Sequence, residues 1–365
     1  MADILKPELQ WIEGRCYRIN DSNTEITSFQ EHDLYENDDV YHDVHDEEED
    51  NDDCDVVQID NSRYTTSFHI SKHYIGSIIG KKGAMKSRIE RDTRTDIKIP
   101  KQGQTGDIVI FGSSATSVKA AQRRINIIVM SSRMKQKATH FISIPMNDPE
   151  IVKSFEVFKN SVLQDCPGRG LDESLFIKPN KLHLTLGVMC LMDNEERLYA
   201  SKLLTEAKEK IIFPLLQNNL PLRIRVKGLS YMNDDPREID VLYGRVQEEG
   251  ASTGLIQKLA DGLLDHFYKA GYMDKDHGRE NVKLHVTLIN SKYRSRSSQP
   301  AGEEDSALSK SSRQTRETFD GTEIFKKYAD YDFGVMELRH IHLSQRHSMG
   351  ADGYYQPTCV ISCWK

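Results

Sequence analysis

The feature that most constrains this chain is a hexapeptide that occurs twice. Residues 181–186 read KLHLTL and residues 283–288 read KLHVTL, so the two histidines are 102 residues apart. An amphipathic helical pattern precedes each copy, at Glu150–Leu163 and at Gly254–Tyr268. Repetition of a whole strand-and-helix series predicts two α/β lobes related by a pseudo-twofold axis.

Each hexapeptide reads as a strand, and a strand alternates its side chains between two faces. Lys181, His183 and Thr185 are therefore expected on one face, with the three leucines anchoring the other. A pseudo-twofold axis would bring the polar faces of both copies into one cleft. The second copy contributes the equivalent set: Lys283, His285 and Thr287.

Two opposed imidazoles suit cleavage of a phosphodiester. Free imidazole titrates near pH ~6.5, so one ring can accept a proton from the nucleophile while the other donates one to the leaving oxygen. Which histidine is acid and which is base stays open. Thr185 and Thr287 can donate hydrogen bonds to the non-bridging oxygens, and the two lysines can offset their charge. This chemistry requires no metal and no other cofactor.

Two other polar groupings have alternative readings. A zinc site would need three or four His, Cys or carboxylate ligands, and threonine is a poor one. His340 and His342 share a strand face and could complete such a site, but a solvated or cleft-rim pair is the preferred interpretation. Asn233–Pro236 contains two aspartates, and its place between two strand patterns favours a hairpin turn.

Two further strands are expected at the C-terminal end: Val335–Leu343 and Pro357–Cys363.

The paired hexapeptides resemble the double H-x-T signature of the two-histidine phosphodiesterase superfamily, which includes RNA 2',5'-ligase-like and A-kinase-anchoring-protein-like enzymes. The resemblance covers residues 139–365, with Ser291–Arg316 expected as a mobile loop because it is rich in serine and charge. It implies a bilobal fold with a central cleft and metal-independent chemistry on RNA phosphodiesters. It also implies catalytic roles for four residues: His183, Thr185, His285 and Thr287.

Residues 64–132 are basic and predict a second domain. Tyr64–Met130 contains twelve Lys or Arg against four Asp or Glu, and its pattern predicts the order β-α-α-β-β-α. Gly80-Lys81-Lys82-Gly83 lies between the first two helices. Glycines let a backbone approach a sugar-phosphate strand closely, helix N-terminal amides attract phosphate, and Lys81 and Lys82 add charge.

This basic segment resembles a type I KH domain, which implies binding of single-stranded RNA. Two positions depart from the family pattern: Lys86 stands where an apolar residue is usual, and Arg94 stands where glycine is common. The connector to the next domain is at most about 8 residues, or roughly 25 Å fully extended, so the two domains are expected to lie close together. The predicted fold class is therefore α+β, a type I KH domain followed by a bilobal, pseudo-symmetric two-histidine phosphodiesterase-like domain.

Residues 1–63 form an N-terminal segment with a predicted disordered acidic linker. Glu31–Val56 contains fourteen Asp or Glu and no Lys or Arg, although the whole chain has a net charge of only -7. Like charges repel and bury little apolar surface. The run is expected to be a solvated tether, with mimicry of a polyanion as the alternative. An apolar cluster upstream is either a hook for a partner or a small added strand: Trp11, Ile12, Tyr17 and Ile19.

The composition of the chain limits which partners and compartments are expected. No apolar run approaches the roughly 18 residues of a membrane span, the N-terminus does not read as a secretory signal, and the spacing of the six cysteines favours reduced intracellular thiols. No membrane partner is therefore expected.

A KH domain joined to a two-histidine domain resembles the RNA-binding subunit of a nuclear, helicase-containing complex. The resemblance implies a helicase and other subunits as partners, roles in transcription co-activation and alkylation damage, and a nuclear location with the cytoplasm as a second site.

Two hypotheses of function follow. The first is an RNA phosphodiesterase whose KH domain holds a single strand while the two histidines exchange protons. The second is a catalytically silent RNA-binding scaffold subunit. Both predict RNA binding, and they differ in whether a phosphodiester is turned over.

Overall fold

A computed structural model describes residues 9–12, 15–18, 56–60, 63–101, 106–250, 254–275, 281–294 and 317–364. Its contacts divide the chain into two units, Met1–Asp53 and Cys54–Lys365. In the first unit, β1 (Leu9–Ile12) pairs antiparallel with β2 (Arg15–Arg18), so part of the N-terminal apolar cluster forms strands. Its role as a partner hook stays a prediction. The predicted acidic linker, apart from Val56, and the predicted loop beyond Arg294 lie outside the described residues.

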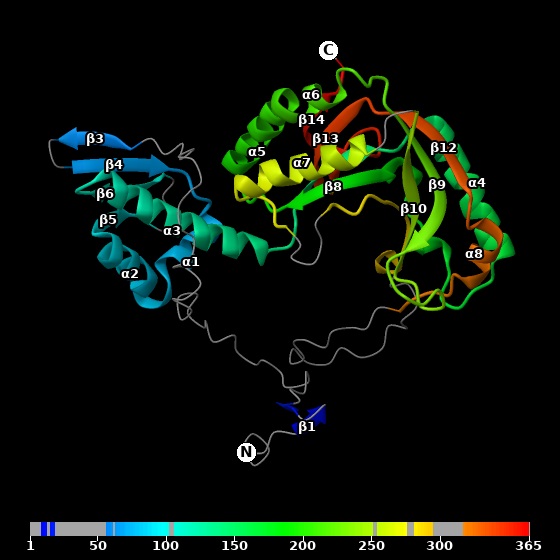
Figure 1. Cartoon of the computed structure of the whole chain (residues 1–365), viewed down its shortest axis with the longest axis horizontal. Helices are drawn as coiled ribbons and strands as arrows, with labels where there is room; N and C mark the ends of the chain where they lie inside the picture. The colour runs from blue at the N-terminus through cyan, green and yellow to red at the C-terminus, as the bar shows by residue number, and fades with distance from the viewer. Residues whose placement is uncertain are drawn as a thin grey trace. The chain divides into compact units, whose positions relative to one another are not determined.

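The second unit begins with the KH-like elements in the predicted β-α-α-β-β-α order (Figure 1). They form an antiparallel sheet of order β3-β4-β6-β5. Strand β3 was not predicted and lies within the N-terminal segment that was expected to hold the linker. The elements are β3 (Val57–Asp60), β4 (Arg63–Phe68), α1 (Lys72–Ile79), the 3₁₀ turn η3 (Lys81–Gly83), α2 (Ala84–Thr93), β5 (Thr95–Lys98), β6 (Ile108–Gly112) and α3 (Ala115–Met134).

Helix α3 packs on this sheet because its apolar residues recur at helical spacing. Ser114 caps the helix, and its hydroxyl accepts a hydrogen bond from the backbone N–H of Ser117. The alternating Ile108 and Ile110 of β6 are likewise buried. The buried stripe of α3 consists of Val118, Ala121, Ile125, Ile128 and Val129.

The two departures from the KH pattern have local explanations. Arg94 ends α2 in the left-handed conformation, at φ 54°, which is where glycine is favoured. Lys86 Nζ lies 2.7 Å from Glu90 Oε1, and the same oxygen accepts a 2.8 Å hydrogen bond from the backbone N–H of Ile97. A polar link thus joins α2 to β5 where the family usually has an apolar contact.

The remaining elements build an eight-stranded sheet of order β12-β9-β10-β11-β8-β7-β13-β14. Its first part comprises β7 (His140–Pro145), α4 (Pro149–Asp165), η4 (Glu173–Leu175), η5 (Pro179–Lys181), β8 (His183–Met189), α5 (Asn194–Ala207), the π-helical turn η6 (Lys208–Ile212) and α6 (Phe213–Leu216). The second comprises β9 (Arg223–Tyr231), β10 (Val241–Glu249), α7 (Leu255–Lys269), β11 (Val286–Asn290), η7 (Ser291–Tyr293), α8 (Thr322–Tyr328), β12 (Asp332–Glu337), β13 (His340–Met349) and β14 (Tyr355–Ser362).

The sheet consists of two four-stranded halves, β14-β13-β7-β8 and β11-β10-β9-β12. The hexapeptide strands β8 and β11 are the inner strands, and in the described residues one antiparallel pair, Val286 with Leu184, joins them. Each half has its hexapeptide strand at the same position, so the predicted pair of pseudo-symmetric lobes is confirmed.

The predicted strand Val335–Leu343 was wrong, because this segment forms two strands. Strand β12 pairs with β9 in one half, whereas β13 pairs with β7 in the other. Between them, buried Leu338 donates its backbone N–H to the carbonyl of Leu222. The C-terminal segment therefore crosses from one half-sheet to the other, which continuous apolar content does not reveal.

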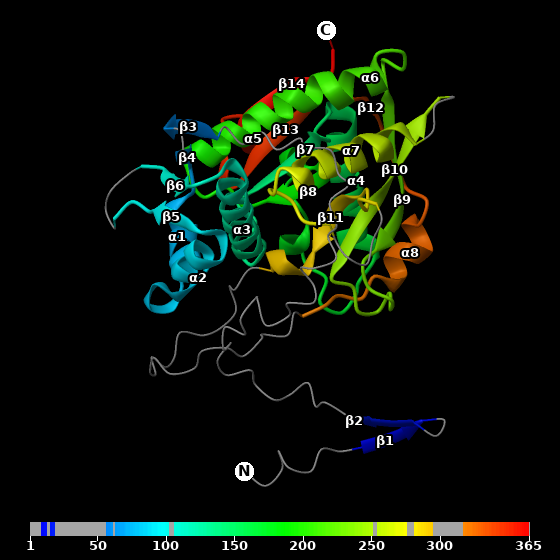
Figure 2. The ribbon, with the colours of Figure 1, turned by 60° about the vertical axis from the view of Figure 1, so that its left-hand side comes forward.

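Helices cover the two halves differently. In Figures 1 and 2, α5 and α7 lie over the half containing β8, β13 and β14, and α4 lies along β12. Asp193 is the N-cap of α5, and its side chain accepts a hydrogen bond from the backbone N–H of Glu196. Asn233–Pro236 lies in the connection between the paired strands β9 and β10, as predicted. No helix within the described ranges is long and apolar enough to cross a membrane.

Candidate active site

The repeated strands place the predicted catalytic residues on one face. Leu184 and Val286 are directly paired and fully buried, so their neighbours along each strand point to the opposite face. Extending this register by one residue sets His183 opposite Thr287 and His285 opposite Thr185. The two histidines are then diagonal neighbours, at a spacing of roughly 7–8 Å. The structure brings all four residues together: His183, Thr185, His285 and Thr287.

The two lysines lie just before the strands rather than within them, and their role at the phosphate stays a prediction. Lys181 ends the 3₁₀ turn η5 before β8 begins, and Lys283 precedes β11. Their side chains lie over aromatic rings instead. Lys181 Nζ is 5.3 Å from the centroid of Tyr355, and Lys283 Nζ is 5.0 Å from that of Tyr243.

The lysine backbones orient the histidines. The Nδ1 atom of His183 lies 2.6 Å from the carbonyl oxygen of Lys181, and Nδ1 of His285 lies 2.7 Å from that of Lys283. Because a carbonyl only accepts, each Nδ1 carries its proton and donates it. The arrangement is the same in both copies, and it orients each ring with Nε2 on the side away from its own backbone carbonyl.

Aromatic side chains that the sequence did not identify surround the imidazoles. The ring of His183 lies between those of Phe141 and Tyr355, at centroid distances of 5.1 and 5.4 Å. The ring of His285 meets that of Tyr243 at 5.4 Å. Burial lowers the pKa of His183 to about 4, and nearby His285 acts in the same direction. No local motif marks these aromatic residues, since they come from separate strands that only the sheet brings together.

The pair His340 and His342 lies on β13, beyond β7. Their ring centroids are 6.2 Å apart, and His342 stands opposite buried Ser143. Burial lowers the pKa of His342. In the part of the chain that the structure describes, no three His, Cys, Asp or Glu residues group as metal ligands would. Four cysteines whose side chains the structure describes are free thiols: Cys166, Cys190, Cys359 and Cys363.

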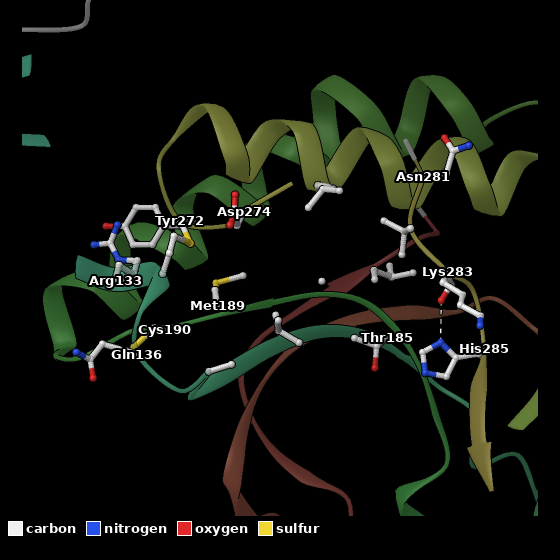
Figure 3. Close-up of a pocket in the computed structure, with 17 residues that line it drawn as sticks. Arg133, Gln136, Thr185, Met189, Cys190, Tyr272, Asp274, Asn281, Lys283 and His285 are labelled. Carbon is white, nitrogen blue, oxygen red and sulfur yellow. Dashed lines mark hydrogen bonds between the residues drawn. The ribbon is translucent and has the colours of Figure 1, made fainter. Parts of the chain in front are cut away.

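A cavity of about 400 Å³ opens from the catalytic residues. One end is lined by Thr185, Lys283 and His285, and the other reaches Arg133 and Tyr272 (Figure 3). The strand β8 runs between these two ends. The candidate site is therefore larger than the space between two imidazoles.

The KH-like elements form a second candidate site. Gly80 has φ 68° and Gly83 has φ 82°, both in the left-handed region. A Cβ atom on Gly80 would lie 2.7 Å from the Cβ of Met85, so only glycine allows this approach to α2. Lys81 and Lys82 between them are exposed. The predicted loop thus presents two cations beside the first amides of α2.

A buried ion pair joins the two domains. Arg133, in the last turn of α3, donates from Nη2 to Glu196 Oε1 at 2.5 Å and from Nη1 to the carbonyl of Gly271 at 2.6 Å. Its guanidinium also lies 4.2 Å from the ring centroid of Tyr272. The side chains of Arg133 and Glu196 are only 7% and 4% exposed. The predicted proximity of the two domains is therefore present as a packed contact.

Comparison with known proteins agrees with this division. Residues 138–362 match the family model of the AKAP7 2'5' RNA ligase-like domain, and residues 65–127 match that of the KH domain. The chain is 33% identical, over 363 residues and 97% of each protein, to "activating signal cointegrator 1 complex subunit 1" of Mus musculus.

Solved structures show a more distant likeness. The structure of E. coli LigT complexed with NADP+ is 14% identical, with a TM-score of 0.34, covering 62% of this chain and 98% of that one. The structure of TT0787 of Thermus thermophilus is 16% identical, with a TM-score of 0.37, covering 62% and 97%.

Proposed function

Since the chain, with its KH and AKAP7 2'5' RNA ligase-like domains, belongs to the family of activating signal cointegrator 1 complex subunit 1, we propose that it is an RNA-binding subunit with a metal-independent two-histidine RNA phosphodiesterase site. The observation that carries this proposal is the diagonal pair of imidazoles on one sheet face, each oriented by the same Nδ1 hydrogen bond to the carbonyl two residues earlier. A phosphorus atom between the two rings would have a proton acceptor on one side and a donor on the other.

The environment of His183 supports a role for it as the base, and we propose His285 as the acid. His183 is neutral near pH 7 because burial lowers its pKa to about 4, so its Nε2 accepts a proton from the attacking water or hydroxyl. The attacking oxygen bonds to phosphorus as the bond to the leaving oxygen breaks. His285 enters this step as the imidazolium, with protons on both nitrogens, and gives the Nε2 proton to that oxygen. Thr185 and Thr287 donate hydrogen bonds to the non-bridging oxygens as negative charge builds up on them.

Turnover can be tested with RNA ends of defined linkage. We expect the protein to convert 2',3'-cyclic or 2',5'-linked ends in the presence of a chelator, and His183→Ala and His285→Ala each to lower kcat/KM by about 10²–10⁴-fold. His266→Ala is the matched control, because this imidazole lies on α7, where its Nε2 is 3.1 Å from the carbonyl oxygen of Leu203, and it should keep the wild-type rate. Product formation followed by chromatography measures these rates.

Loss of activity on chelation, or equal damage from His266→Ala, would exclude the two-histidine mechanism. If the wild-type protein binds RNA but turns over none of these linkages, the second hypothesis holds. The chain is then a catalytically silent scaffold. The packing of its KH domain on its two-histidine domain would be enough for that role.

RNA binding is proposed to depend on the KH loop. Changing both Lys81 and Lys82 to Asp should weaken affinity for single-stranded RNA and lower the slope of log K against log salt by about 1.4, since each phosphate contact contributes about 0.7. Changing exposed Lys153 and Lys202 to Asp makes the same change in net charge and should leave the slope unaltered. Fluorescence anisotropy at several salt concentrations measures the slope. Equal slopes for the two variants would contradict the role of Lys81 and Lys82 in phosphate binding.

We further propose that the chain assembles with a helicase and other subunits in a nuclear coactivator complex that also responds to alkylation damage. The printed name of the mouse relative, which identifies a complex subunit, supports assembly. Purification of the full-length chain from nuclear extract, followed by identification of bound subunits, tests this. Recovery without a helicase would contradict it.

A further inference from the structure

The two catalytic histidines have matching aromatic neighbours that are held differently. Tyr355 lies against the ring of His183, and Tyr243 lies against the ring of His285. Tyr243 belongs to the interior strand β10 and pairs with a strand on each side, β9 and β11. Tyr355 is the first residue of β14, the last strand of the sheet, and in the described residues it pairs with Met349 of β13 only. The sheet therefore holds Tyr243 from both sides, whereas Tyr355 depends on support from elsewhere.

A buried hydrogen bond lies directly beside Tyr355. The hydroxyls of Tyr354 and Ser143 are 3.0 Å apart and share this bond, and the two residues are only 2% and 0% exposed. Ser143 lies in β7 opposite Thr185 of β8, so the bond ties the start of β14 to the strand beside the catalytic one. Because both hydroxyls are shielded from water, removal of either leaves the other buried without its partner.

The imidazole of His342 supports the same tyrosine. His342 of β13 stands opposite Ser143, on the side away from Thr185. These three residues form one row across adjacent strands and share the catalytic face of the sheet. The ring of Tyr354 meets that of His342 almost at a right angle, with centroids 5.6 Å apart. Tyr354 is thus held through both its hydroxyl and its ring.

The turn between β13 and β14 also contacts the residues just before His183. Asn180 Nδ2 donates a hydrogen bond of 3.4 Å to the carbonyl of Asp352. A Cβ atom on Gly353 would lie 3.0 Å from the same nitrogen. The next residue after Asn180 is Lys181, whose carbonyl accepts the Nδ1–H of His183. The turn therefore packs against the segment that orients this imidazole.

We propose that residues 350–354, the anchor turn, position the imidazole of His183, and that Tyr354 is the residue through which they act. The proposal rests on the proposed function for the role of His183 as the base. Ser143 holds the hydroxyl of Tyr354, and Tyr354 holds the adjacent Tyr355 ring against the imidazole. Since Tyr354 and Ser143 are buried, they act through His183 and not on the substrate. Without the anchor the imidazole can rotate away from its backbone carbonyl, and Nε2 is then no longer fixed as the proton acceptor.

Nitrogen NMR of the histidine side chains in the full-length chain near pH 7 tests this without turnover. The wild type should show His183, assigned by loss of its signals in His183→Ala, as the tautomer with its proton on Nδ1. Tyr354→Phe keeps the ring but removes the hydroxyl. It should give a mixture of both tautomers and lower kcat by at least about tenfold with little change in KM.

Tyr331→Phe is the matched control. The hydroxyl of Tyr331 donates a 3.1 Å hydrogen bond to the carbonyl of Ser154, between β12 and α4 in the other half of the domain. This variant also loses one tyrosine hydrogen bond, but it should keep the wild-type tautomer of His183 and the wild-type kcat.

Two further variants keep the test decisive if Tyr354→Phe does not fold. Ser143→Ala removes the other hydroxyl, and the double variant should behave like either single one because all three lose the same hydrogen bond. Gly353→Ala leaves both hydroxyls in place and pushes a Cβ atom toward Asn180 from a backbone with φ 77°. It should also give a mixture of tautomers.

The wild-type tautomer in Tyr354→Phe, Ser143→Ala and Gly353→Ala would overturn the anchor turn, and so would a mixture of tautomers in Tyr331→Phe. If these variants change the tautomer in a chain that turns over no RNA, the anchor turn is supported and the proposed catalysis alone is rejected. If turnover occurs and the tautomer does not respond, the anchor turn alone is rejected.

Discussion

At the scale of single residues, the imidazoles differ in their surroundings although their hexapeptides are almost identical. Both donate Nδ1–H to the carbonyl two residues earlier. The rings of Phe141 and Tyr355 flank His183, whereas His285 contacts the ring of Tyr243. Burial disfavours the protonated ring of His183, so this residue acquires its lowered pKa from neighbours that the hexapeptide does not encode.

This asymmetry predicts the pH dependence of catalysis. Because the pKa of His183 is lowered to about 4, the base stays neutral well below the usual value of about 6.5, and kcat/KM should not fall between pH 6.5 and about pH 5. Tyr355→Ala opens the ring of His183 to water and should move the acidic limb up toward 6.5. Tyr243→Ala, at the equivalent ring beside His285, should leave that limb in place. An acidic limb near 6.5 in the wild type would contradict the assigned base.

At the scale of elements, α1 and the turn that follows it hold two glycines with opposite requirements. Gly80, just after the helix, has positive φ and no room for a Cβ. Gly76 lies inside the helix, and a Cβ there would meet nothing within 4 Å. The G-x-x-G spacing identifies Gly80 as part of the loop. Only the backbone geometry shows that glycine is required at Gly80 and can be replaced at Gly76.

These two glycines give a matched pair of variants. Gly76→Ala should raise the free energy of unfolding by about 0.5–1 kcal/mol, because alanine is the better helix former. Gly80→Ala should lower it by at least about 1 kcal/mol through the left-handed conformation alone, and should weaken RNA binding as Met85 is displaced. Urea unfolding and RNA anisotropy measure the two effects. Equal stability of the two variants would show that the loop is not held in this conformation.

At the scale of the whole molecule, long-range pairings assemble the site. The inner strands β8 and β11 pair at Leu184 and Val286. The C-terminal segment contributes β12 to the half-sheet that contains β11 and β13 to the half-sheet that contains β8. The KH domain is fixed by Arg133, whose partner Glu196 also accepts a hydrogen bond from the backbone N–H of Met192. The catalytic cleft and the domain packing therefore depend on contacts distant in sequence.

Breaking the domain junction should destabilise the chain strongly. Arg133→Met leaves the Glu196 carboxylate buried without its cation, which costs about 3–5 kcal/mol. Arg124→Met removes a pair with Asp92 whose side chains are 36% and 28% exposed, and it should cost at most about 1 kcal/mol. Urea unfolding of both variants provides the comparison. Similar losses would mean that the junction is not a buried ion pair in solution.

The sequence by itself determined the features that repeat within a few residues. Alternation in KLHLTL and KLHVTL gives the face of each histidine and threonine, and G-x-x-G with its flanking helices gives the KH loop. Strand β3, the extents of the strands near Lys181 and Lys283, and the break after Glu337 were not predicted, since hydrophobic alternation does not record where hydrogen bonding to a partner strand stops.

Only the tertiary structure decided which of these features meet. The aromatic rings around His183 come from segments whose sequences carry no mark of one another, and so do Arg133 and Glu196 at the domain junction. Their proximity follows from burying two half-sheets and a KH helix against one another. Proton affinity and pocket shape are properties of that packed environment, and for this physical reason the sequence specified the reacting groups but not their surroundings.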